Sequence, residues 1–466
     1  PYLLSEAEEK AAPAGLVAVD TKPKAGQYKY TMSVSPLDCM GCGECVTVCP
    51  TAAIKMVPQE TRLAEQPLWD YLVKNVSKKA DSGYADSTVK GSQFNQPLLE
   101  FSGSCAGCAE TSYARLITQL FGENMYISNA TGCSSIWGGP AATCPYTINK
   151  DSKKGPAWAN SLFEDNAEHG LGMYVGQKFI RDSLIAKLNE IAASEKASDS
   201  LKAAIAKFME TKDSTIENQE PTKALIAELE KLDCSCKDEI LEKKAYLNKK
   251  SVWIMGGDGW AYDIGFGGLD HVLASGENVN VMVFDTEMYS NTGGQASKAS
   301  NIGEVCQFAA AGKDISKKSL AEIAMSYGYV YVAQIALGAN PAQALKAIQE
   351  AEAYNGPSLI IGYAPCELHG VKGGMNHCQD EMKAAVKAGY WNLFSYNPAL
   401  KAEGKNPFTL TSKEGDGSYQ AFLANETRYS SLTRKFPERA EFLFKKNEEV
   451  AKARFEHLQR LVELYK

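Results

Sequence analysis

Four closely spaced cysteines constrain this chain more than any other feature, because their side chains call for a bound metal group. They follow the pattern Cys39-x2-Cys42-x2-Cys45-x3-Cys49-Pro50. Thiolates at this spacing hold [4Fe–4S] clusters, and a structural zinc site is the alternative. In such runs three cysteines bind one cluster and the fourth serves another. Cys39, Cys42 and Cys45 therefore need one more cysteine, and Cys49 needs three.

The segment around this run has little material for a core of its own. Residues 1–95 are rich in Pro, Lys and Ser, with few long periodic apolar stretches. Since a small hydrophobic core cannot stabilise such a segment, bound iron–sulfur clusters must do so. No cysteine precedes Cys39. We therefore expect residues 1–95 to form the carboxyl-terminal half of a ferredoxin-like two-[4Fe–4S] domain plus a linker. The other half would lie in chain that precedes Pro1.

A second set of cysteines lies further along, as Cys105-x2-Cys108 followed by Cys133. Three thiolates imply a fourth ligand, although a Cys-x2-Cys pair can also be a redox dithiol or half a zinc site. The candidates for the fourth ligand are Cys144, Cys306, Cys366 and Cys378. We favour Cys366 because it follows the apolar segment 358–364, a predicted strand. Parallel α/β proteins build their sites at the carboxyl edge of the sheet.

The second half of the chain alternates between short apolar segments and helical patterns. The expected strands are Val252–Met255, Val281–Phe284, Tyr331–Val332 and Leu359–Ile361, and Asn340-Pro341 should open a helix between the last two. This order predicts a parallel α/β sheet. We assign residues 96–466 to one domain, with a helical insertion at about 176–248 and a terminal helical arm at about 430–466.

Two polar loops directly follow two of the expected strands. The first is Gly256-Gly257-Asp258-Gly259, and the second is 285–294, DTEMYSNTGG. Glycines let backbone N–H groups approach a diphosphate, while Asp258 and an oxygen from the second loop can hold Mg²⁺. A Gly-Asp-Gly string alone is weak support, but two such loops at one sheet edge favour a magnesium–diphosphate site.

These loops resemble the diphosphate motif of thiamine-diphosphate enzymes, and longer strings are similar to pyruvate:ferredoxin oxidoreductases. The strings are 256–268 (GGDGWAYDIGFGG), 285–295 (DTEMYSNTGGQ), 132–139 (GCSSIWGG) and 155–172 (GPAWANSLFEDNAEHGLG). With both cysteine sets, the resemblance covers nearly the whole chain and corresponds to the carboxyl-terminal portion of that long enzyme. It implies a parallel-sheet domain that binds thiamine diphosphate through its diphosphate, preceded by part of a ferredoxin-like domain.

The resemblance also implies a role for each motif residue. The cluster proximal to the thiamine would be bound by Cys105, Cys108, Cys133 and Cys366, and the ferredoxin-like clusters by Cys39, Cys42, Cys45 and Cys49. Mg²⁺ would be held by Asp258, the Thr286 side chain and the Met288 carbonyl. Contacts to thiamine diphosphate would come from Glu110, Cys133, Gly257, Asp258, Gly259, Trp260, Thr286, Glu287, Met288, Tyr289, Ser290 and Asn291. Asn291 and Cys133 are the implied catalytic positions. Thiamine enzymes usually have Asn where Thr286 stands, a departure that this family shares.

The implied reaction is the oxidative decarboxylation of pyruvate with coenzyme A to acetyl-CoA and CO₂. Electrons would pass through three [4Fe–4S] clusters to ferredoxin or flavodoxin. The activating glutamate would come from a separate domain, so we expect the chain alone to be inactive. The resemblance also implies that the complete enzyme is a homodimer. Two alternatives stay open: an oxidoreductase for another 2-oxo acid, such as 2-oxoglutarate, and a non-catalytic iron–sulfur electron-transfer module.

Composition narrows the partners further. Lys and Arg total 49 against 56 Asp and Glu, a net charge of −7, which argues against a nucleic-acid partner. No stretch approaches the roughly 20 apolar residues that a membrane helix needs, so no membrane partner is expected. We expect the protein to be located in the cytoplasm of an anaerobe, with an organelle as the alternative location. The five histidines lack metal-site spacing and are predicted to be structural, His369 being the one nearest the expected site.

Overall fold

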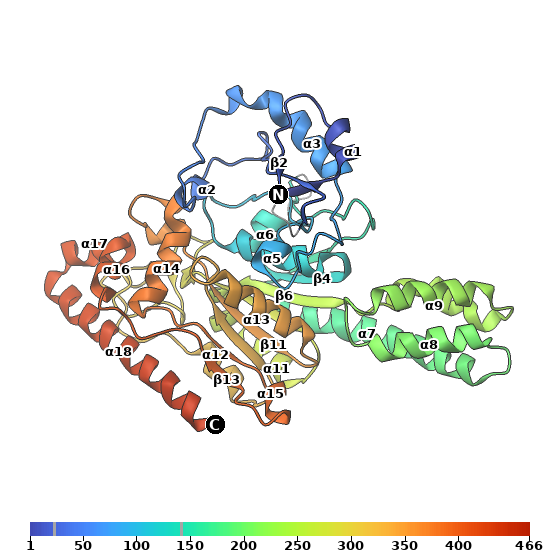
Figure 1. The fold of residues 1–466 in the computed structure, drawn as a ribbon. Helices are drawn as coiled ribbons and strands as arrows, with labels where there is room; N and C mark the ends of the chain where they lie inside the picture. The colour runs from blue at the N-terminus through green and yellow to red at the C-terminus, as the bar shows by residue number, and fades with distance from the viewer. Residues whose placement is uncertain (22–24, 140–142) are drawn as a thin grey trace.

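The computed structural model describes residues 1–21, 25–139 and 143–466 (Figure 1). Within them, the largest sheet has eight strands in the order β13-β12-β10-β11-β7-β6-β4-β5. Its parallel strands are β4 (Met125–Ala130), β5 (Ala157–Ser161), β6 (Ser251–Gly257), β7 (Asn280–Asp285), β10 (Tyr331–Ile335) and β11 (Ser358–Tyr363). At one end of the sheet, β12 (Phe394–Tyr396) pairs antiparallel with β10 and with the edge strand β13 (Phe408–Leu410). The predicted α/β fold is confirmed.

The central strands are buried on both faces, which explains their nearly unbroken apolar sequences. All six residues of β7 are buried, as are six of the seven in β6. Helices on either side of a parallel sheet exclude water in this way. The principal covering helices are α5 (Glu110–Phe121), α11 (Phe266–Ala274), α12 (Leu320–Met325), α13 (Pro341–Ala353) and α14 (Cys378–Ala388). Helix α13 begins as predicted, because the Asn340 side chain accepts from the Gln343 N–H and Pro341 occupies the first turn.

Two strands, β4 and β5, lie earlier in the chain than the predicted strands. They are short and contain polar residues such as Ser128 and Asn129, so an apolar pattern does not identify them. In the sheet, β4 lies between β5 and β6, and β7 lies on the far side of β6. The direction in which strands are added therefore reverses between β4 and β6. Such a reversal opens a crevice at the carboxyl ends of the strands, where α/β proteins bind ligands.

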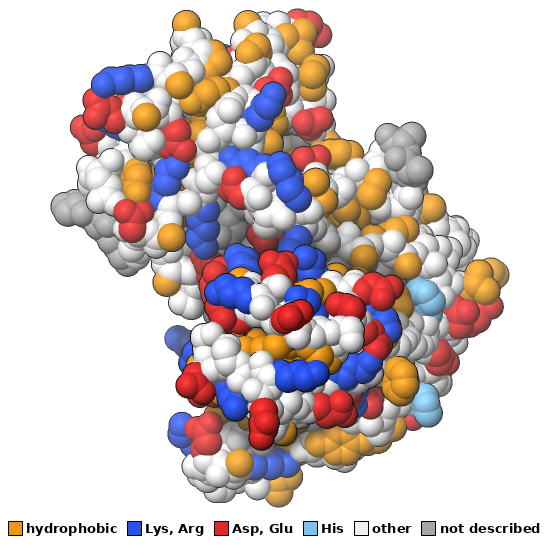
Figure 2. Space-filling view, turned by 90° about the vertical axis from the view of Figure 1, so that its right-hand side faces the viewer, with side chains coloured by type: hydrophobic (Ala, Val, Ile, Leu, Met, Phe, Trp, Pro, Cys, Tyr) orange, Lys and Arg blue, Asp and Glu red, His pale blue; other side chains and the backbone are white. Residues whose placement is uncertain are grey.

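A helical arm connects β5 to β6. It contains α7 (Asn166–Ala193), α8 (Asp199–Thr211), α9 (Gln219–Lys231) and α10 (Asp238–Glu242), and Figure 1 shows α8 and α9 extending away from the sheet. The arm has its own core, which includes Leu184, Leu188, Leu201, Leu225 and Leu229. Helix α7 contacts both β4 and α8, so one helix joins the arm to the sheet. Figure 2 shows charges of both signs interspersed over the face that includes the arm.

The C-terminal helices pack beside the sheet. They are α15 (Ala399–Ala402), α16 (Tyr419–Asn425), α17 (Thr427–Lys435) and α18 (Pro437–Leu464). Helix α18 contacts α17 and the edge strand β13, and its buried residues include Leu443, Phe455 and Leu458. The predicted terminal amphipathic helix is therefore present. Among the described residues, no helix combines the length and apolar character that a membrane-spanning segment requires.

The N-terminal segment has a small sheet, β1 (Tyr2–Leu4), β2 (Val19–Asp20) and β3 (Lys29–Thr31), with β3 in the centre. Its helices are α1 (Glu6–Ala11), α2 (Glu44–Thr47), α3 (Gln66–Asn75) and α4 (Val89–Ser92). The core here is limited to Leu4, Leu72 and Val76 with a few partly buried neighbours. The loops around the first cysteine run leave Val34, Leu37 and Met56 exposed.

Candidate active site

Four loops meet at the carboxyl edge of the central sheet, because each follows one of four neighbouring parallel strands. Strand β4 leads to Cys133 at the start of α6 (Cys133–Gly138), β6 leads to Asp258, β7 to Thr286 and β11 to Cys366. Gly257 pairs with Phe284, and Tyr363 pairs with Asp285, so these strands end at nearly the same level. The sequence predicted that the loops after β6, β7 and β11 lie at this edge, but not that the loop after β4 joins them.

Three oxygen atoms converge where the loops after β6 and β7 touch. The Thr286 hydroxyl lies 2.8 Å from Asp258 Oδ1 and 3.0 Å from the Met288 carbonyl oxygen. The Thr286 backbone N–H also donates to Asp258 Oδ1, at 3.2 Å. Ser297 donates to the other carboxylate oxygen at 2.7 Å. Carboxylate, hydroxyl and carbonyl oxygens are the ligands that Mg²⁺ prefers, so this donor set fits the ion.

The backbone conformation of Glu287 brings these oxygen atoms together. Its φ of +62° is in the left-handed region, which costs a residue other than glycine about 1–3 kcal/mol. The turn at Glu287 brings Thr286 and Met288, its two neighbours, within hydrogen-bond distance of each other. A short hairpin follows, with β8 (Met288–Tyr289) paired to β9 (Gln295–Ala296).

The surroundings carry an excess of buried negative charge. Five fully buried carboxylates, those of Asp258, Asp285, Glu287, Glu304 and Glu426, surround the buried cations Lys317 and Arg428. Burial raises the pKa of Asp258 well above its usual range, and the charge of Asp285 adds to the rise. A divalent cation at Asp258 would relieve this excess, which is a second reason why Mg²⁺ fits.

The glycines of the first loop leave room for a ligand. A Cβ atom built on Gly257 would meet nothing nearer than 3.9 Å, the distance to the Phe284 carbonyl oxygen. At Gly259 it would lie 2.7 Å from the Tyr289 ring. Trp260 is fully buried and its indole N–H has no hydrogen-bond partner, whereas Asn291 is exposed. Gly257 therefore marks open space, and Gly259 allows the two loops to pack closely.

The second cysteine set gathers beside these loops. Burial raises the pKa of the Cys133 thiol, and the charges of Glu110 and Cys366 add to the rise, with smaller contributions from Cys108 and Cys105. Burial also raises the pKa of Cys366, although a hydrogen bond from Ser290 opposes it. Cys105, Cys108, Cys133 and Cys366 are thus mutual neighbours. Iron supplies the positive charge that four neighbouring thiolates require, so the set fits a [4Fe–4S] cluster.

Glu110 occupies the first turn of α5, between this cysteine set and the sheet. Its carboxylate accepts a 2.8 Å hydrogen bond from the Trp137 indole N–H. Burial raises the pKa of Glu110 to about 7. Of the other candidates for a fourth ligand, the thiols of Cys144 and Cys306 donate to Gly138 and Glu304, both at 3.3 Å. Cys378 is buried, and burial followed by the charges of Glu44, Cys108, Glu381 and Cys366 raises its pKa.

The first cysteine run divides into two parts. Burial raises the pKa of Cys45, and its neighbours Cys42 and Cys39 add to the rise, so these three lie together. The surroundings of Cys49 differ: the backbone N–H of Ala53, 3.3 Å from its sulfur, makes the largest of several hydrogen-bond contributions that lower its pKa to about 7.

The first cysteine run also contacts the segment between β11 and α14. The Asn376 amide donates to the Thr47 hydroxyl at 3.3 Å, and the Gln379 amide donates to Glu44 at 3.5 Å. In the described part of the chain, no three His, Cys, Asp or Glu side chains lie close enough to hold a single metal ion. Neither candidate site requires such a group of three. The magnesium-type oxygen set contains only one carboxylate, and the cysteines of a cluster bind different iron atoms.

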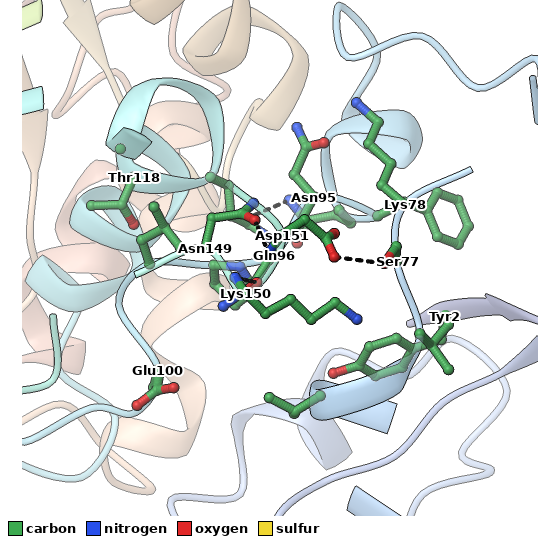
Figure 3. Close-up of a pocket in the computed structure, with 18 of the residues that line it drawn as sticks. Tyr2, Ser77, Lys78, Asn95, Gln96, Glu100, Thr118, Asn149, Lys150 and Asp151 are labelled. Atoms are coloured by element: carbon green, nitrogen blue, oxygen red, sulfur yellow. Dashed lines mark hydrogen bonds between the residues drawn. The ribbon is translucent and has the colours of Figure 1, made fainter. Parts of the chain in front are cut away.

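A cavity formed by other described residues lies away from these loops. It has a volume of about 880 Å³ and lies between the N-terminal segment, helix α5 and residues 149–152 (Figure 3). Tyr2, Ser77, Glu100 and Lys150 line it, and Ser77 donates to Asp151 at 3.0 Å. None of the predicted cofactor residues lines this cavity.

Two family models match parts of the chain. Residues 242–361 match the thiamine pyrophosphate enzyme C-terminal TPP binding domain, and residues 32–55 match the 4Fe-4S binding domain. The pyruvate:ferredoxin oxidoreductase of Moorella thermoacetica is 52% identical over 99% of this chain and 40% of its own length. The pyruvate-flavodoxin oxidoreductase of Klebsiella pneumoniae is 51% identical over 99% of this chain and 39% of its own length. Over 99% of its length the chain is therefore similar to pyruvate:ferredoxin and pyruvate-flavodoxin oxidoreductases.

The chain spans about 40% of the length of these pyruvate:ferredoxin and pyruvate-flavodoxin oxidoreductases, and a carboxyl-terminal portion fits the match. A mitochondrial pyruvate dehydrogenase [NADP(+)] of Euglena gracilis is 45% identical over 99% of this chain and 26% of its own length. A solved 2-oxoglutarate:ferredoxin oxidoreductase from Magnetococcus marinus is 14% identical over 56% of this chain and 63% of its own, with a TM-score of 0.34. A TM-score this low does not establish a shared fold.

Several residues that shape the site were not predicted from the sequence. Ser297 binds Asp258, Lys317 binds both Asp285 and Glu287, and Arg428 binds Glu287. No motif marks them. His369, predicted to be structural, is fully buried and lies 2.8 Å from the Thr286 carbonyl oxygen through Nε2.

Proposed function

We propose that the complete protein oxidatively decarboxylates pyruvate with coenzyme A to acetyl-CoA and CO₂. Electrons pass through three [4Fe–4S] clusters to ferredoxin or flavodoxin. One observation carries the proposal: an oxygen set suited to Mg²⁺ and a four-cysteine set suited to a cluster adjoin at one sheet edge, where Ser290 contacts both Thr286 and Cys366.

Each part of the site has a task in this proposal. Asp258, the Thr286 hydroxyl and the Met288 carbonyl hold Mg²⁺, and Gly257 and Gly259 let the diphosphate approach the backbone. When bound, thiamine diphosphate supplies the electron sink for loss of CO₂ from a 2-oxo acid, and the clusters carry the electrons away. The contributions of the protein are binding, orientation and charge.

The cysteines define the electron path. Cys105, Cys108, Cys133 and Cys366 bind the cluster nearest the thiamine. Cys39, Cys42 and Cys45 serve a second cluster, and Cys49 serves a third. The contacts of Glu44 and Thr47 with Gln379 and Asn376 support this path, because they bring the first cysteine run against the loop that begins at Cys366.

The expectations about substrate binding, location and oligomeric state concern the complete protein. We expect further chain to supply substrate-binding residues and the complete protein to be a cytoplasmic homodimer. The test is an anaerobic assay of the full-length protein for reduction of ferredoxin or flavodoxin that depends on both pyruvate and coenzyme A. Reduction by 2-oxoglutarate instead of pyruvate would reassign the substrate. With clusters and thiamine bound, reduction by neither acid would contradict the proposal.

A further inference from the structure

The buried side chain of Glu287 is held by donors from four separate segments. Arg428 Nη2 lies 2.9 Å from one carboxylate oxygen, and the Tyr390 hydroxyl lies 2.5 Å from the same atom. The Asn301 amide lies 2.8 Å from the other oxygen, and Lys317 Nζ lies 3.1 Å from it. With the side chain fixed from several directions, the left-handed turn of Glu287 is fixed too.

Arg428 is the central member of this set. Its guanidinium is fully buried and, besides Glu287, it reaches Glu426 at 2.7 Å and Glu304 at 3.2 Å. A planar, permanently charged fork can bind three carboxylates in a way that a single ammonium group cannot. Helix α17, which carries Arg428, is therefore connected to the loop after β7 and to the loop around Glu304.

His369 closes the connection from the other side. Its Nε2 lies 2.8 Å from the Thr286 carbonyl oxygen, which can only accept, so Nε2 carries the proton. Its Nδ1 lies 3.4 Å from Glu426, the residue that Arg428 also binds. The backbone N–H of His369 donates to the backbone carbonyl of Cys366 at 2.9 Å. A series of largely buried neighbours thus runs from Cys366 through His369, Glu426 and Arg428 to Glu287, with no hydrogen bond between His369 Nδ1 and Glu426.

We propose that Arg428 and His369 are positioning residues that hold the Thr286–Met288 turn in its magnesium-binding shape and fix it relative to the loop that carries Cys366. Neither side chain needs to touch the cofactor. Both act through atoms that do: Arg428 through the torsion of Glu287, and His369 through the carbonyl of Thr286. The inference rests on the proposed function, because it concerns how the thiamine and cluster sites are kept together.

The test measures binding of thiamine diphosphate to the full-length protein with Mn²⁺ in place of Mg²⁺, using the Mn²⁺ paramagnetic resonance signal. For Arg428→Lys we expect the Kd to rise at least about tenfold, the lower end for partners that orient metal ligands, with iron content unchanged. Arg439→Lys is the matched control, since Arg439 pairs with Asp314 near the surface, and it should leave the Kd unchanged. A folded Arg428→Lys protein with the unaltered Kd would overturn the proposal.

A second pair of variants decides the matter if Arg428→Lys does not fold. His369→Ala should raise the Kd by a similar factor, and His369→Gln, which keeps an N–H donor at that position, should restore much of the affinity. Equal affinity in His369→Ala and the unaltered protein would refute the positioning role. Failure of the unaltered protein to bind thiamine diphosphate would instead refute the proposed function, so the two failures are distinguishable.

Discussion

The Thr286 hydroxyl lies 2.8 Å from the Asp258 carboxylate, joining the loops that follow two adjacent parallel strands. Both groups are buried and neither approaches a positive side chain closely enough to form an ion pair with it in the described part of the chain. The contact therefore brings together oxygen atoms that form no ion pair with a positive side chain. A magnesium ion is the partner that this arrangement is suited to hold.

Asp258→Asn should abolish cofactor binding while preserving the fold. The amide has the shape of the carboxylate and can still accept from Thr286, but it lacks the charge that binds a divalent ion. We expect the affinity for thiamine diphosphate with Mg²⁺ to fall by at least about a hundredfold, beyond the usual effect of outer partners. Isothermal titration of the full-length protein measures this, and unchanged affinity would remove Asp258 from the metal site.

Gly257→Ala separates ligand binding from folding. Because a Cβ at Gly257 meets nothing within 3.8 Å, the variant should unfold at the same temperature as the unaltered protein. The added methyl group would occupy space assigned to the diphosphate, so we expect binding to weaken about tenfold or more, which corresponds to roughly 1.4 kcal/mol.

Gly267→Ala is the control for this experiment. Gly267 lies in helix α11 with open space around its Cα, and alanine there should leave binding unchanged and stabilise the helix by up to about 1 kcal/mol. Equal binding by Gly257→Ala and Gly267→Ala would show that the diphosphate does not approach Gly257.

Cys366→Ala and Cys378→Ala distinguish the two nearest candidates for the fourth cluster ligand. Cys366→Ala should remove the proximal cluster, a loss of about four iron atoms per chain. Cys378→Ala should keep full iron content, because Cys378 lies on a helix behind the site. Iron analysis after anaerobic purification gives the answer, and the reverse pattern would transfer the ligand role to Cys378.

Leu229→Ala tests whether the helical arm is stabilised separately from the sheet. Leu229 is fully buried in the core of the arm, so the substitution should cost about 2–5 kcal/mol locally. Hydrogen exchange should increase in α8 and α9 and remain unchanged in β6 and β7. Ile216→Ala, at an exposed position in the arm, is the matched control. Faster exchange across the central strands would show that arm and sheet unfold together.

Much of the site could be predicted from the sequence because its residues directly follow strands. Cys366, Asp258 and Thr286 each lie within a few positions of an apolar segment, and parallel strands bring their carboxyl ends to one edge. Strands β4 and β5 escaped prediction because Ser128, Asn129 and Asn160 interrupt their apolar patterns. Within the sheet β4 is largely buried, whereas β5 lies at the edge and stays partly exposed.

The support behind the site could not be predicted in the same way. Arg428 and Glu287 are distant in the chain, and their 2.9 Å contact depends on how α17 packs against the sheet. A buried ion pair leaves no periodic signal in the sequence. The left-handed turn at Glu287 is equally hidden, since glutamate carries no preference for that conformation.

The central claim is that a thiamine site and a cluster adjoin on this chain, and rapid anaerobic mixing of the full-length protein with pyruvate tests it most directly. We expect loss of visible cluster absorbance on adding pyruvate, a much smaller loss with 2-oxoglutarate, and a diminished loss in Gly257→Ala protein that retains its iron. Absorbance that pyruvate leaves unchanged while clusters and thiamine diphosphate are bound, or a loss that Gly257→Ala does not diminish, would contradict it.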